Sequence, residues 1–115
     1  MHQAVHRECL AARTSLGMMD ASTLGKIDVQ GSDAREFLSR IYTNAWMNLA
    51  PGSCRYGLMC NEKGMIIDDG VSTCINDNHF IMTTTTGGAA SVYSALEMWL
   101  QTESVSYTHL RAHET

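Results

Sequence analysis

The strand pairing of this chain is decided at residues 55–71, which read RYGLMCNEKGMIIDDGV. Two apolar runs flank the polar turn at residues 61–64, and the glycine that ends this turn can take the positive φ that a hairpin requires. The stretch therefore predicts a β-hairpin. Its second strand carries two adjacent aspartates, Asp68 and Asp69. A carboxylate within a strand is costly unless a partner or a function accounts for it.

Alternation along this second strand decides which aspartate faces the interior. The residues that share a face with Asp69 are Met65, Ile67, Val71, Thr73 and Ile75. Because this face is the more apolar one, we expect it to turn toward the core or a pocket and to make Asp69 a functional carboxylate. Asp68 is expected to bond to a neighbouring backbone or loop. Two alternatives stay open: both aspartates are structural, or a bulge near Gly70 exchanges the two faces.

Periodicity on either side of the hairpin predicts the remaining elements. Apolar residues recur at helical spacing over residues 5–16, 34–42 and 89–99, and Ser32 is the expected N-cap of the second helix. Strands are expected at residues 24–31, 55–60, 65–75 and 79–85. Since hairpins join most of these strands, the order α-β-α-β-β-β-α predicts an α+β fold, an antiparallel-rich sheet with helices packed on it.

The composition restricts the class of protein and its partners. The chain has 115 residues, 44% of them hydrophobic and 17% charged, which suits one small soluble domain. Its net charge of −4 gives no support to nucleic-acid binding. No apolar stretch approaches the roughly 18 residues that span a membrane, and the N-terminus lacks the apolar core of a signal peptide. We therefore expect a soluble, cytoplasmic protein.

The cysteines give no sign of a metal site. Cys9, Cys54, Cys60 and Cys74 form no C-x-x-C pair, and the five histidines supply no closely spaced partner. Buried free thiols in a reducing compartment are the expected state.

The last eleven residues, 105–115, break the pattern of the preceding sequence. They read VSYTHLRAHET, without an apolar period or a turn signal. Written as codons, they reproduce the transposon adapter used in preparing sequencing libraries. We therefore expect residues 105–115 to be a translated adapter and residues 1–104 to be the native part, and we leave this tail out of the fold expectation.

Four segments together resemble a known family. They are residues 20–31 (DASTLGKIDVQG), 42–44 (YTN), 55–59 (RYGLM) and 67–70 (IDDG). In this order and spacing they resemble the aminomethyltransferase-type, tetrahydrofolate-binding domain, over residues 4–103. The resemblance implies that residues 1–104 form the N-terminal portion of that folate-binding fold.

Two branches of the family are close: the glycine-cleavage T-proteins and the alpha subunits of heterotetrameric sarcosine oxidase. The chain resembles the second branch at residues 20–24, at Gly70 after the aspartate pair, and at residues 83–86. That branch implies oxidative demethylation of sarcosine to glycine, with methylene transfer to tetrahydrofolate and formation of hydrogen peroxide. It also implies FAD, FMN and NAD in the parent complex, and as partners the rest of the alpha subunit with the beta, gamma and delta subunits.

The resemblance also implies roles for particular residues. Asp69 matches the catalytic carboxylate that contacts the folate amine, and Tyr56 matches a folate-contacting tyrosine. Leu24 matches the apolar wall of the pterin site, and Thr84 lies where the family lines the pocket from the strand after the hairpin. From the residues alone, Tyr56 is equally a cross-strand aromatic and Leu24 a core residue of its strand. Gly87-Gly88 is read as a turn rather than as an anion site.

Other functions stay open. The alternatives are a T-protein-type aminomethyltransferase, a non-catalytic folate-binding module, and a scaffold piece without activity of its own. We expect this chain alone to be inactive, because the later half of the folate domain and the flavin-binding parts are absent from it.

Overall fold

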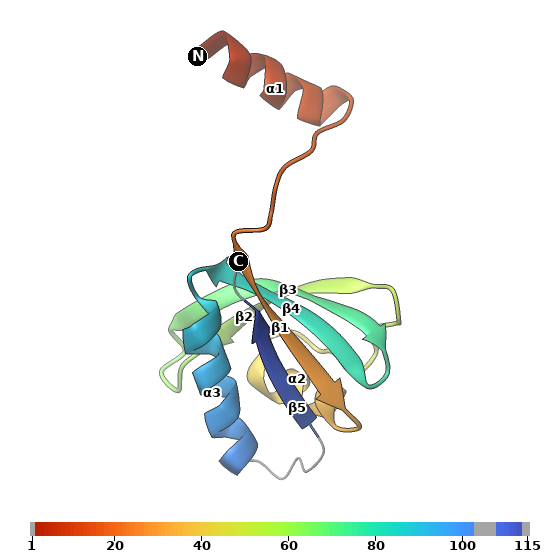
Figure 1. The fold of residues 1–115 in the computed structure, drawn as a ribbon, viewed down its shortest axis with the longest axis vertical. Helices are drawn as coiled ribbons and strands as arrows, with labels where there is room; N and C mark the ends of the chain where they lie inside the picture. The colour runs from red at the N-terminus through yellow and green to blue at the C-terminus, as the bar shows by residue number, and fades with distance from the viewer. Residues whose placement is uncertain (1, 103–107, 114–115) are drawn as a thin grey trace.

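The structure is a computed structural model, and it describes residues 2–102 and 108–113. That part of the chain contains three helices and five strands (Figure 1). In chain order they are α1 (His2–Thr14), β1 (Leu24–Gly31), α2 (Ala34–Ile41), β2 (Cys54–Cys60), β3 (Ile66–Asn76), β4 (His79–Thr86), α3 (Ala89–Thr102) and β5 (Thr108–His113). The first seven elements follow the order expected from the sequence.

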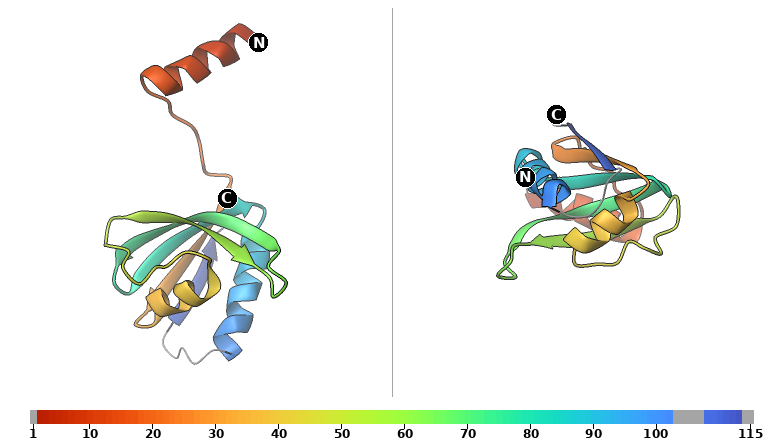
Figure 2. Two further views of the ribbon diagram at one scale, coloured as in Figure 1. Left: turned by 180° about the vertical axis from the view of Figure 1, so that it is seen from behind. Right: turned by 90° about the horizontal axis from the view of Figure 1, so that it is seen from below.

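One antiparallel sheet holds the molecule together. Its strand order is β2-β3-β4-β1-β5, and every neighbouring pair runs antiparallel. Helices α2 and α3 lie on the same side of this sheet, and no helix of the described residues covers its other side, called the open face below (Figure 2). The expected α+β fold with helices packed on an antiparallel-rich sheet is confirmed.

The core lies between the sheet and these two helices. Its largest fully buried side chains are Trp46, Phe37, Phe80, Ile27, Leu38, Met59, Met82, Leu96 and Val29. The expected stripe of α2 is confirmed, since Ala34, Phe37 and Leu38 are buried. On α3 the expectation fails at its last position, because Trp99 is 40% exposed. The N-cap of α2 falls at Asp33 rather than at Ser32.

Arg35 ties the loop that follows α2 to the helix itself. Its Nη1 donates to the carbonyl oxygens of Trp46 at 2.6 Å and Leu49 at 2.7 Å. Its Nη2 lies 3.1 Å from Asp77 Oδ1, and the guanidinium lies over the Phe80 ring at 5.2 Å. One side chain therefore satisfies carbonyl groups that have no strand or helix partner.

Helix α1 forms as expected, but it does not join the core. None of its residues is buried, and the connection at residues 15–23 carries it away from the sheet (Figure 1). The expected buried thiols are confirmed only at Cys74, because Cys9 and Cys54 are exposed and Cys60 is partly so. Among the described residues, no helix is long and apolar enough to cross a membrane.

The tail contributes a strand that the sequence reasoning had left out. Residues 108–113 form β5, which pairs with β1 from Lys26 opposite His113 to Gly31 opposite Thr108. Strand addition of this kind uses backbone groups, so an unpaired edge accepts an extended segment whatever its side chains. The sequence pattern predicted no strand at residues 108–113. Residues 105–107 and 114–115 lie outside the described part.

We predict that Arg35→Met lowers the free energy of unfolding by about 2–3 kcal/mol, because the Leu49 carbonyl loses its Arg35 donor and the Trp46 carbonyl keeps only the backbone N–H of Leu49. Urea unfolding followed by tryptophan fluorescence measures the change. Arg40→Met is the matched control: Arg40 pairs with Glu36 on the surface of the same helix, and its loss is expected to cost about 0.5 kcal/mol or less. Equal losses in the two variants would contradict this account of the loop.

Candidate functional site

The two faces of β3 are exchanged relative to the sequence expectation. Asp68 is only 7% exposed and lies on the core side together with Ser72 and Cys74, whereas Ile67 and Ile75 are 52% and 47% exposed. The expectation that the face with Asp69 turns toward the core was therefore wrong, and its alternative, that this face lines a pocket, stays a prediction.

The large core side chains of β4 explain why the two faces of β3 are exchanged. Across the β3–β4 pair, Ser72 lies opposite Met82 and Cys74 lies opposite Phe80. The two large side chains of β4 fill the space beneath the sheet, so β3 contributes small residues there. Its apolar side chains point to the open face instead.

Asp68 has a structural partner at the far end of β4. Its Oδ1 accepts a hydrogen bond from the Thr85 hydroxyl at 2.6 Å, and its Oδ2 accepts one from the Thr85 backbone N–H at 3.4 Å. Burial, and next the nearby charge of Asp68, raise the pKa of Tyr42 above its usual range. The expectation that Asp68 bonds to a neighbouring backbone or loop is confirmed.

Asp69 lies on the open face and is bonded to Tyr56. The Tyr56 hydroxyl donates to Asp69 Oδ2 at 2.5 Å. Across the β2–β3 pair, Asp69 is opposite Leu58 and Tyr56 is opposite Val71, so the tyrosine reaches the carboxylate along the diagonal. This hydrogen bond, then partial burial and the charge of Asp69, raises the pKa of the Tyr56 phenol.

Gly70 brings β3 close to β4 beside this pair. A Cβ at Gly70 would lie 2.0 Å from the carbonyl oxygen of Thr83, a distance that only glycine permits. The Thr83 hydroxyl in turn accepts the backbone N–H of Val71 at 2.9 Å. Asp69 is therefore held next to β4 by a contact that needs a residue without a side chain.

The four residues named from the sequence do not all come together. Tyr56 and Asp69 are bonded, and Leu24 is the partly buried first residue of β1, opposite Thr86. Thr84 is 1% exposed, and its hydroxyl donates to the Thr85 carbonyl at 3.0 Å on the core side. Thr84 thus lies on the other face from Asp69.

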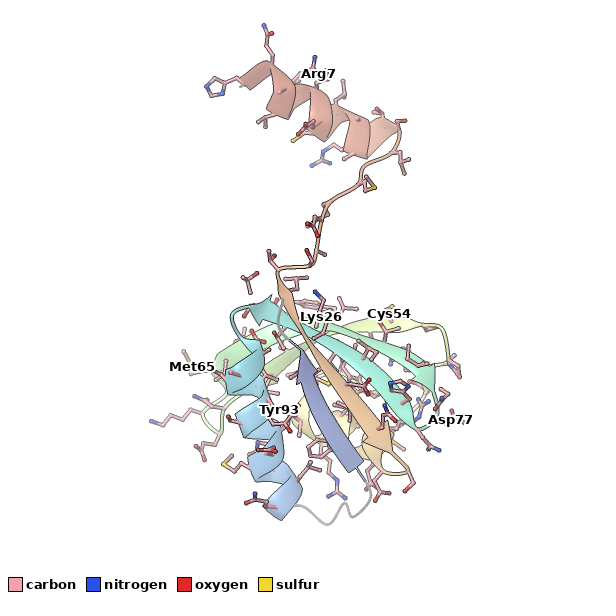
Figure 3. The ribbon with its side chains drawn as sticks, in the orientation of Figure 1. Arg7, Lys26, Cys54, Met65, Asp77 and Tyr93 are labelled. Atoms are coloured by element: carbon pink, nitrogen blue, oxygen red, sulfur yellow. The ribbon has the colours of Figure 1, made fainter. Side chains whose placement is uncertain are left out.

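Thr83, which was not among the residues predicted from the sequence, is a β4 threonine on the same face as Asp69, and its hydroxyl bonds to the backbone of Val71. Alternation from the buried Phe80 and Met82 would have found it, since Thr84 follows them on the core side. Lys26 and Cys54 lie on this open side of the sheet, away from the helices (Figure 3).

The open face around Asp69 combines one carboxylate with apolar surroundings. The apolar neighbours of Asp69 are Ile67 and Val71, on the same face of β3, and Leu58 across the strand pair. A carboxylate in such a setting can accept a hydrogen bond or a proton from an amine. Within residues 2–102 and 108–113, no group of three or more histidine, cysteine, aspartate or glutamate side chains is placed to hold a metal ion.

Comparison with known proteins adds a family match and several relatives. The model of the GCVT N-terminal domain matches residues 1–114. The sarcosine oxidase subunit alpha of Corynebacterium sp. (strain P-1) is 57% identical over 103 residues, 90% of this chain and 11% of that protein. The aminomethyltransferase of Staphylococcus epidermidis (strain ATCC 35984) is 30% identical over 105 residues, 91% of this chain and 28% of that protein.

A solved structure resembles the fold as well. The glycine cleavage system aminomethyltransferase T from Bartonella henselae superposes with a TM-score of 0.74 at 28% identity, over 83% of this chain and 26% of that one. The chain thus spans only about a tenth of the sarcosine oxidase relative and about a quarter of each aminomethyltransferase.

The adjacent aspartates should respond differently to the same substitution. We predict that Asp68→Ala lowers the free energy of unfolding by about 1–2 kcal/mol, because it removes the acceptor of both Thr85 donors. Asp69→Ala should lower the free energy of unfolding by less than half as much, since the hydrogen bond that it removes, from the Tyr56 hydroxyl to Asp69, is exposed to solvent. Urea unfolding of both variants and the parent chain measures the difference, and a larger loss at Asp69 would refute the assignment of the two faces.

Proposed function

The chain belongs to the family of the GCVT N-terminal domain, and from that premise we propose that it is the folate-binding part of a sarcosine oxidase alpha subunit. The proposed enzyme demethylates sarcosine oxidatively to glycine, transfers the methylene unit to tetrahydrofolate and forms hydrogen peroxide. The support for this branch is the identity of 57% to a sarcosine oxidase subunit alpha, against 30% to an aminomethyltransferase.

The observation that carries the proposal is the exposed pair of Asp69 and Tyr56. Asp69 is the carboxylate that the family resemblance marks, and the Tyr56 hydroxyl is bonded to one of its oxygens. The other oxygen is available to a ligand on the open side of the sheet. We assign to Asp69 the role of base or electrostatic partner for the folate amine.

The residues around Asp69 fit tetrahydrofolate in their chemistry. A pterin is flat, largely apolar on its faces and edged with amine groups, and it suits a carboxylate set among Leu58, Ile67 and Val71. We propose that Leu24, Tyr56 and Asp69 hold it from the open face, with Thr84 supporting the site from the core side of β4. When bound, tetrahydrofolate supplies the nitrogen atoms that accept the one-carbon unit.

The chemistry of this chain's own residues is limited to binding and proton transfer. Asp69 would accept a hydrogen bond from the ligand amine and then its proton, as the nitrogen becomes bonded to carbon. Oxidation of sarcosine needs the redox groups of the parent complex, for which we propose FAD, FMN and NAD on other parts of it. The proposed partners are the rest of the alpha subunit and the beta, gamma and delta subunits.

A T-protein-type aminomethyltransferase is the second candidate, and the structural likeness to the Bartonella henselae enzyme favours it. The genomic DNA on both sides of this reading frame separates the two. An upstream region encoding a dinucleotide-binding domain supports the sarcosine oxidase, whereas a short gene encoding a T-protein alone overturns it. The same DNA tests our proposal that residues 1–104 are native and residues 105–115 a translated adapter.

We predict that Asp69→Ala in the complete enzyme lowers methylene transfer to tetrahydrofolate at least about 100-fold, because it removes the proposed base. Flavin reduction by sarcosine should persist, so the one-carbon unit should appear as free formaldehyde after hydrolysis of the imine. Stopped-flow flavin absorbance and product analysis measure the two steps.

Glu62→Ala is the matched control, since Glu62 is an exposed carboxylate on the β2–β3 turn, and it should leave both steps unchanged. The role given to Asp69 would be contradicted if Asp69→Ala lost flavin reduction but still transferred to tetrahydrofolate whatever methylene unit it formed.

A further inference from the structure

The hydroxyl of Tyr56 is placed to act on Asp69 rather than on a ligand. We propose that Tyr56 is a positioning residue: its hydroxyl holds Asp69 Oδ2, which leaves Oδ1 as the oxygen presented to the ligand amine. The inference rests on the proposed function and assigns to Tyr56 a task separate from contact between its ring and the folate.

The need for such a residue follows from the torsional freedom of aspartate. The terminal torsion of a carboxylate side chain is broad and roughly two-fold, so an unrestrained Asp69 would present either oxygen. A hydrogen bond to one oxygen of a charged group is strong and directional. The 2.5 Å contact from Tyr56 to Oδ2 therefore selects one orientation of the carboxylate.

Tyr56 is alone in this task among the residues that the structure describes. Within residues 2–102, Asp69 Oδ2 receives the Tyr56 hydroxyl and Oδ1 receives no hydrogen bond. The cross-strand partner of Asp69 is Leu58, and its neighbours on the same face of β3 are Ile67 and Val71. None of these three side chains carries a donor.

The geometry also keeps the hydroxyl available as a donor. Because the bond to Asp69 raises the pKa of the Tyr56 phenol, the group stays protonated through neutral and mildly alkaline pH. Tyr56 is 52% exposed, so its ring can contact a ligand while its hydroxyl is held by Asp69. Ring contact and positioning are therefore separable by one substitution, Tyr56→Phe, which keeps the ring and removes the hydroxyl.

The experiment measures sarcosine-driven methylene transfer by the complete enzyme, at varied tetrahydrofolate, in Tyr56→Phe, Asp69→Asn and the double variant. We expect Tyr56→Phe to lower kcat of transfer by about tenfold with little change in KM for tetrahydrofolate. In the Asp69→Asn background, Tyr56→Phe should lower kcat no further, because the carboxylate that the Tyr56 hydroxyl positions is no longer present.

Tyr93→Phe is the matched control. Tyr93 also bonds to a carboxylate, that of Glu97, on helix α3, so this variant removes the same atom from a tyrosine–carboxylate pair elsewhere in the domain. It should leave kcat and KM unchanged, and thermal unfolding of all variants shows that each is folded.

Three results would overturn the inference. A raised KM with unchanged kcat in Tyr56→Phe would show that the hydroxyl binds the ligand directly. Unchanged kinetics would show that it does nothing, and a full tenfold loss in the Asp69→Asn background would show that it acts independently of Asp69. If Asp69→Asn itself transfers normally, the proposed function fails as well, and that result is distinguishable from the other three.

Discussion

The distribution of side-chain volume between β3 and β4 is the constraint on which the site depends. Phe80 and Met82 fill the space between the sheet and the helices, and the residues opposite them on β3 are Cys74 and Ser72. Large side chains at these β3 positions would overfill the core. The apolar side chains of β3 are therefore left on the open face, and Asp69 lies among them.

This arrangement gives two neighbouring aspartates opposite environments. Asp68 is buried, and the cost of removing its charge from water is offset by the two donors of Thr85. Those bonds join β3 to the end of β4 where α3 begins. Asp69, one position later, faces outward and is held by Tyr56. Asp68 thus helps to hold β3 against β4, and the same strand carries Asp69 of the proposed site.

Family membership and geometry contribute different parts of the functional argument. The match to the GCVT N-terminal domain identifies the family, whereas the structure shows that only two of the four residues marked by resemblance are in contact. Thr84 fills the core next to Gly25, where an added Cβ would lie 2.2 Å from its hydroxyl. Its neighbour Thr83 occupies the face of Asp69. A resemblance between sequences aligns positions along a strand, but a shift of one residue moves a side chain to the opposite face.

The sequence by itself determined the first seven elements, the turn at residues 61–64 and the antiparallel character of the sheet. Local propensity and periodicity suffice for these, because each depends on residues near in the chain. Only the tertiary structure decided which face of β3 is covered, that Trp99 is exposed, and that β1 accepts a strand from residues 108–113. Those outcomes depend on the volumes and backbone edges of elements distant in sequence, and the apolar pattern of a single strand carries no information about them.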